Sequence, residues 1–357
     1  MIDCQSGGSR QFAGVLKPAL KKDALEDPVG FRRALRAWFE KEGKDYPWRR
    51  TRDPYAILVS EVMLQQTQIA AVLGRGFYAR FMERFPDTRT LASAEDDVLL
   101  KTWEGLGYYR RARMLREAAR VVEEQCGGEF PKDHQAVLGL PGVGRYTAGA
   151  VMSFAYDEAQ PLVDGNVARV LARLMDFSEE IDGGKAQKQL WAWAEELLDR
   201  AYPRIYNSAL MELGQTFCRT GQPDCLECPV AKFCRTRHPA ELPKKAKRVK
   251  VTELDEHVVF AERDGCVLLK KLEAGRREGM WRLPERAAAE VADWALLHRR
   301  KYGITRYRVT LHVHADEGIE AGEGEVWQPH ADVPGLVMPP ADRAALAAVT
   351  GDAEEIA

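Results

Sequence analysis

The sequence of 357 residues lacks any run of eighteen consecutive apolar residues, although 45% of its residues are hydrophobic. It therefore offers no candidate for a membrane-spanning helix, and its apolar content is sufficient for two or three separate cores. The first ten residues also lack the apolar stretch of a secretory signal peptide. We expect a protein that makes no contact with a membrane and works in the cytoplasm, assuming a bacterial cell.

Strong charge of either sign is also missing, because the net charge is only -2. The balance conceals an asymmetry: residues 1–252 carry 39 Lys and Arg against 34 Asp and Glu, whereas residues 253–357 carry 13 against 20. A modest positive surplus permits nucleic-acid binding, but ordinary solvated surfaces give the same pattern. Charge alone therefore selects no partner.

Cysteine is scarce, and four of the seven cysteines fall within residues 218–234. This crowding differs from the spacing of a secreted disulfide framework. The four are separated by six, two and five residues, in the order Cys218, Cys225, Cys228 and Cys234. Four thiolates in so short a span can hold an iron–sulfur cluster or a tetrahedral zinc ion. Because only one Cys-x-x-Cys pair is present, the spacing favours a [4Fe–4S] cluster over zinc, with a disulfide third.

The alternating polarity of β-strands is absent from residues 30–235, where apolar residues recur at helical spacing. Asp53-Pro54 is a typical helix start, since Asp caps free N–H groups and Pro has no N–H to leave unpaired. We expect this helix to continue to Thr67. Glu61 lies within it among leucine, valine and methionine residues, which predicts a partly buried carboxylate. A surface glutamate paired with an arginine is the alternative.

Two short glycine-containing segments separate predicted helices. In the first, Gly142 and Gly144 permit a tight turn before a helix that starts near Arg145, whose free N–H groups form a natural phosphate site. Many Pro-Gly turns between helices have the same sequence without binding any ligand. In the second, Asp164 precedes a predicted helix and is either a helix cap or a functional carboxylate.

The pattern changes after a basic, proline-containing stretch that we interpret as a linker. Short β-branched and aromatic runs over 257–261, 266–270 and 305–314 alternate with turn signals, which predicts an α+β domain. The predicted organisation is a mobile arm (1–26), an all-α domain (27–238), a basic linker (239–252), an α+β domain (253–350) and a tail (351–357).

The order of these motifs resembles the helix–hairpin–helix DNA glycosylases related to endonuclease III. Residues 60–67 and 105–109 are similar, more closely, to the MutY family of adenine DNA glycosylases, which act on adenine opposite 8-oxoguanine. The resemblance is dense over 30–235 and fainter in the last hundred residues, which look like that family's MutT-like (Nudix-like) recognition domain. It implies a [4Fe–4S] cluster on the four cysteines. It also implies a monomer that binds double-stranded DNA with 8-oxoG:A or G:A mispairs, at the bacterial nucleoid.

The resemblance also implies roles for four catalytic residues. Glu61 matches the acid that protonates adenine N7, and Asp164 the carboxylate that stabilises positive charge at C1′ or bonds to it. Tyr146 stands where bifunctional relatives carry a lysine that forms a Schiff base, which implies a monofunctional glycosylase without significant AP lyase activity. Tyr146 and Asn166 match residues that position the nucleotide and Asp164.

Further matching residues contact DNA, because the adenine must be flipped out of the duplex. The implied adenine pocket contains Trp48, Arg49, Leu64 and Ser208. The implied DNA contacts are Gln65, the wedge Gln66, Tyr108 near the 8-oxoguanine, Leu140, Gly142, Gly144 and Thr305. Two positions depart from the family: relatives tend to have Glu or Gln at Ser208, and commonly Phe-Ser-His where this chain has Ile304-Thr-Arg306.

Three other functions remain open at this stage. A Nudix hydrolase of free nucleotides would need an acidic metal-binding helix directly after Pro284, where Glu285-Arg-Ala-Ala-Ala289 has no Glu-Glu pair. A thymine-glycol-type glycosylase and lyase would trap on DNA with borohydride, which Tyr146 argues against. A non-enzymatic DNA-binding or redox-sensing protein would explain the cysteines but gives Glu61 and Asp164 no role.

Overall fold

The computed structural model describes residues 24–246, 251–304, 306–316, 318 and 320–351. Thr305, residues 247–250 of the predicted linker, nearly all of the predicted arm and most of the predicted tail lie outside the described residues. The chain forms two compact units. The first, here the helical unit, comprises Met1–Ile69, Phe85–Ala92 and Met114–Lys247, and the second, the mixed unit, comprises Ala70–Arg84, Ser93–Arg113 and Arg248–Ala357.

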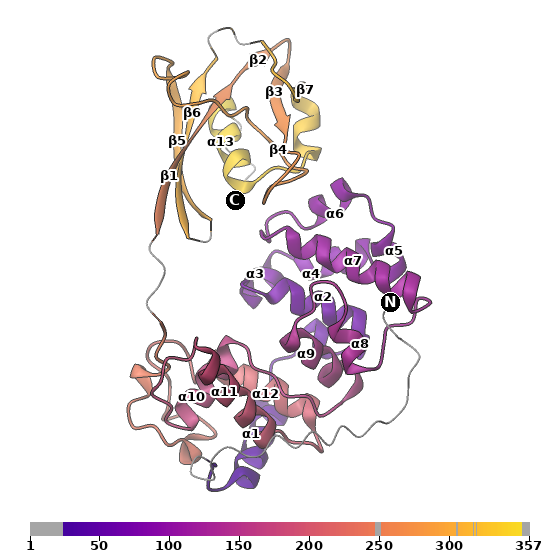
Figure 1. The fold of residues 1–357 in the computed structure, drawn as a ribbon, viewed down its shortest axis with the longest axis vertical. Coiled ribbons are helices and arrows are strands. Elements are labelled where there is room, and N and C mark those ends of the chain that lie inside the picture. The colour runs from indigo at the N-terminus through magenta and orange to yellow at the C-terminus, as the bar shows by residue number, and fades with distance from the viewer. Residues whose placement is uncertain (1–23, 247–250, 305, 317, 319, 352–357) are drawn as a thin grey trace. The chain divides into compact units, whose positions relative to one another are not determined.

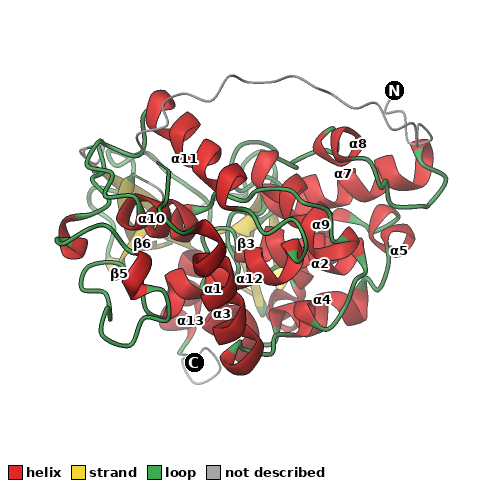
Figure 2. Cartoon of the chain, turned by 90° about the horizontal axis from the view of Figure 1, so that it is seen from below, coloured by secondary structure: helices red, strands yellow, loops and turns green. Residues whose placement is uncertain are grey.

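The helical unit confirms the expectation of an all-α region. Its helices are α1 (Pro28–Glu42), α2 (Pro54–Leu64), α5 (Thr88–Ala92), α8 (His134–Leu138), α9 (Arg145–Tyr156), α10 (Gly165–Leu174), α11 (Gly184–Leu197) and α12 (Pro203–Thr216), with 3-10 turns η1 (Pro47–Arg49), η2 (Ala231–Phe233) and η3 (Pro239–Glu241). Helices α3 (Ile69–Gly74) and α7 (Arg110–Gln125) cross the unit boundary. No strand forms in the described part of residues 24–246, and Figure 2 shows helices joined by loops.

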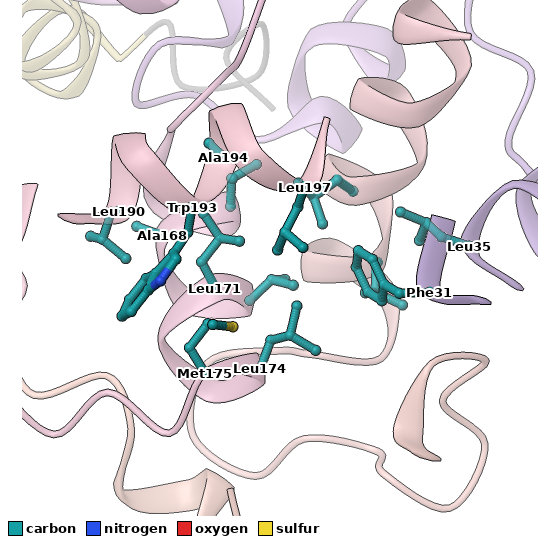
Figure 3. Packing of buried hydrophobic residues seen from close by; sticks show 14 of the residues in the cluster. Phe31, Leu35, Ala168, Leu171, Leu174, Met175, Leu190, Trp193, Ala194 and Leu197 are labelled. Atoms are coloured by element: carbon teal, nitrogen blue, oxygen red, sulfur yellow. The ribbon is translucent and has the colours of Figure 1, made fainter. Parts of the chain in front are cut away.

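One apolar core fixes the helices that carry the site. Side chains of α1, α10 and α11 converge there, as Figure 3 shows for Phe31, Leu171 and Trp193. Full burial of one side chain of this size contributes about 1.5–3 kcal/mol, and α10 also packs against α12. Asp164 immediately precedes α10, and Ser208 lies on α12.

Helix α2 starts as predicted and ends earlier than predicted. Asp53 caps it by accepting from the N–H groups of Tyr55 (3.0 Å) and Ala56 (3.3 Å). The helix stops at Leu64, because Gln65 is extended and Gln66 has a left-handed backbone with φ 59°. The prediction that it continues to Thr67 was therefore wrong. No glycine or proline marks this end in the sequence.

The mixed unit contains two sheets and the remaining helices. Strands β1 (Thr252–Phe260), β6 (Tyr307–Ala315) and β5 (Leu296–Ile304) lie side by side in that order (Figure 1), with β1 parallel and β5 antiparallel to β6. The second sheet contains β2 (Glu262–Arg263), β3 (Cys266–Lys271), β4 (Trp281–Arg282) and β7 (Glu325–Pro329). The other elements are α4 (Phe77–Arg84), α6 (Asp96–Thr102), η4 (His330–Gly335) and α13 (Pro340–Thr350).

One predicted strand starts later than expected, and one strand was not predicted. The strand expected over 305–314 begins at Tyr307, which pairs with Ile304 across a hairpin. Strand β5 was missed because it is an edge strand whose exposed residues 299–301 are Arg-Arg-Lys, so it lacks apolar alternation. No helix lies between β4 and β5 in these described residues, so the metal-binding helix that a Nudix hydrolase needs at this place is missing.

None of the described helices is long and apolar enough to cross a membrane.

Candidate active site

A pocket in the helical unit contains five of the residues predicted for the site. Its empty space of about 490 Å³ includes open solvent, and only about 40 Å³ of it can hold the centre of a water-sized sphere. The predicted residues in its wall are Trp48, Arg49, Glu61, Leu64 and Ser208. The other wall residues are Tyr46, Ile57, Ser60, Ile69, Phe154, Arg204, Met211 and Gln215, none of which was predicted. Elements far apart in the sequence thus meet around one carboxylate.

That carboxylate, Glu61, is only 5% exposed. Burial raises its pKa to about 7, since a charged carboxylate is poorly solvated there. A hydrogen bond from Tyr146 and the charge of Arg49 oppose this rise, whereas the charge of Asp164 adds to it. Near neutral pH, Glu61 is therefore divided between its protonated and ionised forms and can donate or accept a proton.

Tyr146 belongs to the first turn of α9, and its hydroxyl lies close enough to Glu61 to act on the pKa of that carboxyl and donates a hydrogen bond to Met211 Sδ (3.8 Å). Burial and the charges of Glu61 and Asp164 hold its pKa well above the ordinary tyrosine value. The side chain therefore stays a neutral phenol and a hydrogen-bond donor at any physiological pH.

Asp164 has the first of the two roles that the sequence left open, because it caps helix α10, and its charge also acts on Glu61. Its carboxylate accepts from the Val167 N–H (2.7 Å) and from Asn166 Nδ2 (2.9 Å). Burial raises its pKa, although these hydrogen bonds pull it down. Asn166 Oδ1 in turn accepts from Arg169, whose guanidinium also donates to the carbonyl of Cys218 (2.7 Å). The Asp164 side chain is thus fixed by its own helix.

Two charged residues near the pocket were not predicted from the sequence. Glu212, 1% exposed, forms an ion pair with Arg49 and accepts from the Lys44 N–H (3.0 Å). Arg204 donates to the carbonyls of Arg49 (2.7 Å) and Thr51 (2.8 Å), which ties η1 to α12. A signal for Glu212 was available, because it follows Ser208 by four residues and so shares its helix face.

Gln66 and Tyr108 share an unusual backbone conformation. Both are exposed and have positive φ, 59° for Gln66 and 48° for Tyr108, in turns at the ends of helical segments. The other described non-glycine residues with positive φ are aspartates, which tolerate it better. Such strain often occurs at functional sites. Gln65 is the half-buried residue that ends α2.

The glycine hairpin has the backbone that its sequence predicted. Leu140 is buried, and Gly142 has φ 75° with Met114 so close that an added Cβ would lie 2.7 Å from its Cβ. Gly144 has ordinary φ, open space around it, and starts α9 without any side-chain cap. The first-turn N–H groups of α9 are thus open to an anion.

These two glycines give a matched pair of variants. We expect Gly142→Ala to lower the free energy of unfolding by about 1–3 kcal/mol, from left-handed strain and the Met114 contact. Gly144→Ala should lower it by less than about 1 kcal/mol, and should weaken duplex binding because its methyl group covers the open helix end. Urea unfolding and fluorescence anisotropy with labelled DNA measure both effects. Equal losses of stability would contradict this account.

The four predicted metal ligands follow α12 in one loop. Their thiols lie close enough for their charges to act on one another, and burial raises the pKa of Cys228 and Cys234 to about 11. Arg173, 2% exposed, donates to Cys218 Sγ (3.4 Å) and to the Arg219 carbonyl (2.7 Å). Among the described residues, no three His, Cys, Asp or Glu side chains are grouped closely enough to hold a metal ion.

Comparisons with known proteins agree with this fold. The family profile described as HhH-GPD superfamily base excision DNA repair protein matches residues 59–196, which include Glu61, the hairpin and Asp164. A solved structure of a thermostable thymine-DNA glycosylase has 31% sequence identity and a TM-score of 0.52, and the match covers 58% of this chain and 95% of that one. The chain belongs to the HhH-GPD superfamily of base excision DNA repair proteins.

Within that superfamily, the chain is similar to adenine DNA glycosylases. The human protein of that name is 44% identical over 238 residues, which cover 64% of this chain and 43% of the human one. The Arabidopsis thaliana protein is 34% identical over 311 residues, covering 74% and 48% respectively. The match thus spans less than half the length of either relative.

Proposed function

We propose that this protein is a base-excision-repair adenine DNA glycosylase, which flips adenine mispaired with 8-oxoguanine or guanine out of duplex DNA and hydrolyses its glycosidic bond. The observation that carries the proposal is the buried Glu61, with a pKa of about 7, in a pocket wall and within the field of Asp164. Double-stranded DNA is the partner, and the protein acts as a monomer.

The first step is proton transfer to the base. Adenine leaves poorly as an anion, and protonation at N7 makes it a neutral leaving group. Glu61, half protonated near neutral pH, supplies that proton in a pocket whose wall includes Trp48 and Leu64. Tyr146 holds the Glu61 carboxyl through its hydroxyl.

The second step leaves positive charge on the sugar. Asp164 stabilises it at C1′, or bonds to it transiently, as a carboxylate does in retaining glycosidases. Its two hydrogen bonds, from Val167 and Asn166, fix the carboxylate before the substrate arrives. Water then completes hydrolysis and the strand stays intact.

The absence of a lysine at Tyr146 makes the enzyme monofunctional, because a phenol cannot form a Schiff base with the sugar. We expect no borohydride-trapped complex with the wild type, and a detectable one with Tyr146→Lys. Tyr146→Phe is the matched control, since it keeps the ring and removes the hydroxyl. Strong trapping by the wild type or by Tyr146→Phe would contradict monofunctional chemistry.

DNA binding uses the exposed hairpin and the two strained residues. The open N-terminus of α9 at Gly144 binds a phosphate, and Gln66 with Gln65 fills the gap left by the flipped base. Tyr108 inserts near the 8-oxoguanine. In this assignment residues 27–238 form the catalytic domain, and residues 253–350 form a MutT-like domain that inspects the oxidised base with Thr305.

The cofactor of this proposal is a [4Fe–4S] cluster held by Cys218, Cys225, Cys228 and Cys234. The superfamily often carries such a cluster, and the mutual proximity of the four thiols supports it here. When bound, the cluster orders this loop and has the capacity for electron transfer. We expect about four irons per purified chain and no stoichiometric zinc in elemental analysis. One zinc per chain would contradict the assignment.

The substrate assignment is tested by measuring free adenine by mass spectrometry after incubation with matched duplexes. We expect release from 8-oxoG:A and from G:A, and none from T:A. Release of thymine glycol from a duplex that carries it, without release of adenine, would instead support a different glycosylase.

A further inference from the structure

An ion pair with one member in the pocket wall lies close to Glu61. Arg49, at the end of η1, pairs with Glu212 of α12, and their side chains are 19% and 1% exposed. Both Glu212 oxygens are used, since Oε1 accepts from the Lys44 N–H (3.0 Å) and Oε2 accepts from Arg49. The Arg49 guanidinium also lies over the rings of Phe39 (4.9 Å) and Tyr46 (4.7 Å). The pair is therefore fixed in one geometry.

The two members of the pair differ in their access to the pocket. Arg49 and Glu61 both form part of its wall, whereas Glu212 is not among the wall residues. A cation beside a carboxyl group favours loss of the carboxyl proton, and the effect is strong where water is excluded. If Glu212 did not balance its charge, Arg49 would therefore lower the pKa of Glu61.

We propose that Glu212 is a positioning residue that compensates the charge of Arg49 and thereby allows Glu61 to keep its proton at neutral pH. The inference rests on the proposed function, in which Glu61 is the acid. Buried ion pairs are seldom retained for stability alone, because the cost of desolvation offsets their attraction. A role in setting the charge of the pocket accounts for this one.

The titratable groups around Glu61 change its pKa in different directions. Tyr146 on α9 and Arg49 on η1 lower its pKa, and Asp164 at the start of α10 raises it. Arg204 on α12 also lies in the pocket wall, but its guanidinium is bonded to the carbonyls of Arg49, Thr51 and Phe154. Among these groups, Arg49 is the one whose charge Glu212 balances directly.

The test is the pH profile of single-turnover adenine release from an 8-oxoG:A duplex. Because Glu61 must be protonated, the rate falls as pH rises through its pKa. We expect Glu212→Gln to move this midpoint down by about one pH unit, so that its rate falls about tenfold at pH 8 and little at pH 5.5. The double variant Arg49→Met/Glu212→Gln should return the midpoint to the wild-type value or above.

A single variant with the opposite expected sign guards against simple misfolding. Arg49→Met leaves the Glu212 charge unbalanced near Glu61, so its midpoint should move up, whatever the variant does to the maximal rate. A midpoint unchanged in Glu212→Gln, or a uniform loss of rate at every pH, would overturn the proposal. Thermal melting identifies any unfolded variant.

An activity-independent readout separates this inference from the proposed function. Carbon NMR of glutamate-labelled protein, with the Glu61 signal assigned through Glu61→Gln, follows the titration of that carboxyl directly. A downward shift of the Glu61 titration midpoint in Glu212→Gln supports the inference even if the enzyme releases no adenine. The lack of adenine release would refute the proposed function alone. An unshifted titration in an active enzyme would refute the inference alone.

Discussion

Replacing Asp164 by asparagine should lower the single-turnover rate of adenine release by about 10²–10³-fold, the usual loss when one group that stabilises transition-state charge is removed. Affinity for the mispaired duplex should change little, because asparagine keeps the shape of the side chain. Stability should also change little, since asparagine caps helices as well as aspartate does and can accept from the Val167 N–H. Measuring both the rate and the duplex affinity of this variant therefore shows whether Asp164 acts in the chemical step or in binding.

Asp133→Asn is the matched control for this variant. Asp133 caps α8 in the same manner, accepting from the N–H groups of Gln135 and Ala136 at 2.9 Å, and has no role in the proposed chemistry. It should retain the wild-type rate. An Asp164→Asn enzyme with undiminished rate would remove Asp164 from the mechanism, and loss of duplex binding would assign it to binding instead.

Glu61→Gln should lower the rate by about 10²–10⁴-fold, the range for removal of a general acid. The wild-type rate should fall as pH rises through about 7, where Glu61 loses its proton. A pH-independent rate from pH 6 to 8 in the wild type would contradict the role of Glu61. Single-turnover rates across this range measure both effects.

The raised pKa of Glu61 also predicts that the free energy of unfolding depends on pH. The pKa of Glu61 is raised from 4.5 to about 7 on folding, so its protonated form is favoured in the folded state. Stability from this group is fully present below pH 4.5 and is lost as pH rises through 7, by about 3 kcal/mol in total. Glu61→Gln should therefore be more stable than the wild type at pH 8. Urea unfolding at pH 5 and pH 8 measures the difference.

Local sequence signals predicted much of the helical unit. The Asp53-Pro54 start of α2, the turn at Gly142 and the start of α9 near Arg145 follow from backbone preferences of single residues. The partial burial expected for Glu61 followed from its apolar neighbours, and 5% exposure confirms it. These features depend on contacts a few residues apart in the chain.

Features that depend on distant contacts were not predictable in this way. Residues 65–67 are compatible with helix, so the end of α2 at Leu64 is fixed by tertiary structure. The position of Glu212 four residues after Ser208 could have marked it as a site residue, but no local pattern identifies its partner Arg49, 163 residues away in the chain. Strand β5 has charged, exposed residues because it is an edge strand, a position that only the assembled sheet defines.

The central claim is that this chain removes adenine opposite 8-oxoguanine and leaves the strand uncut. The most direct test is an end-labelled 8-oxoG:A duplex incubated with the wild-type protein and then divided into samples with and without hot alkali. We predict cleavage at the adenine position only in the alkali-treated sample. Cleavage without alkali would contradict monofunctional chemistry, and no cleavage in either sample would contradict adenine excision itself.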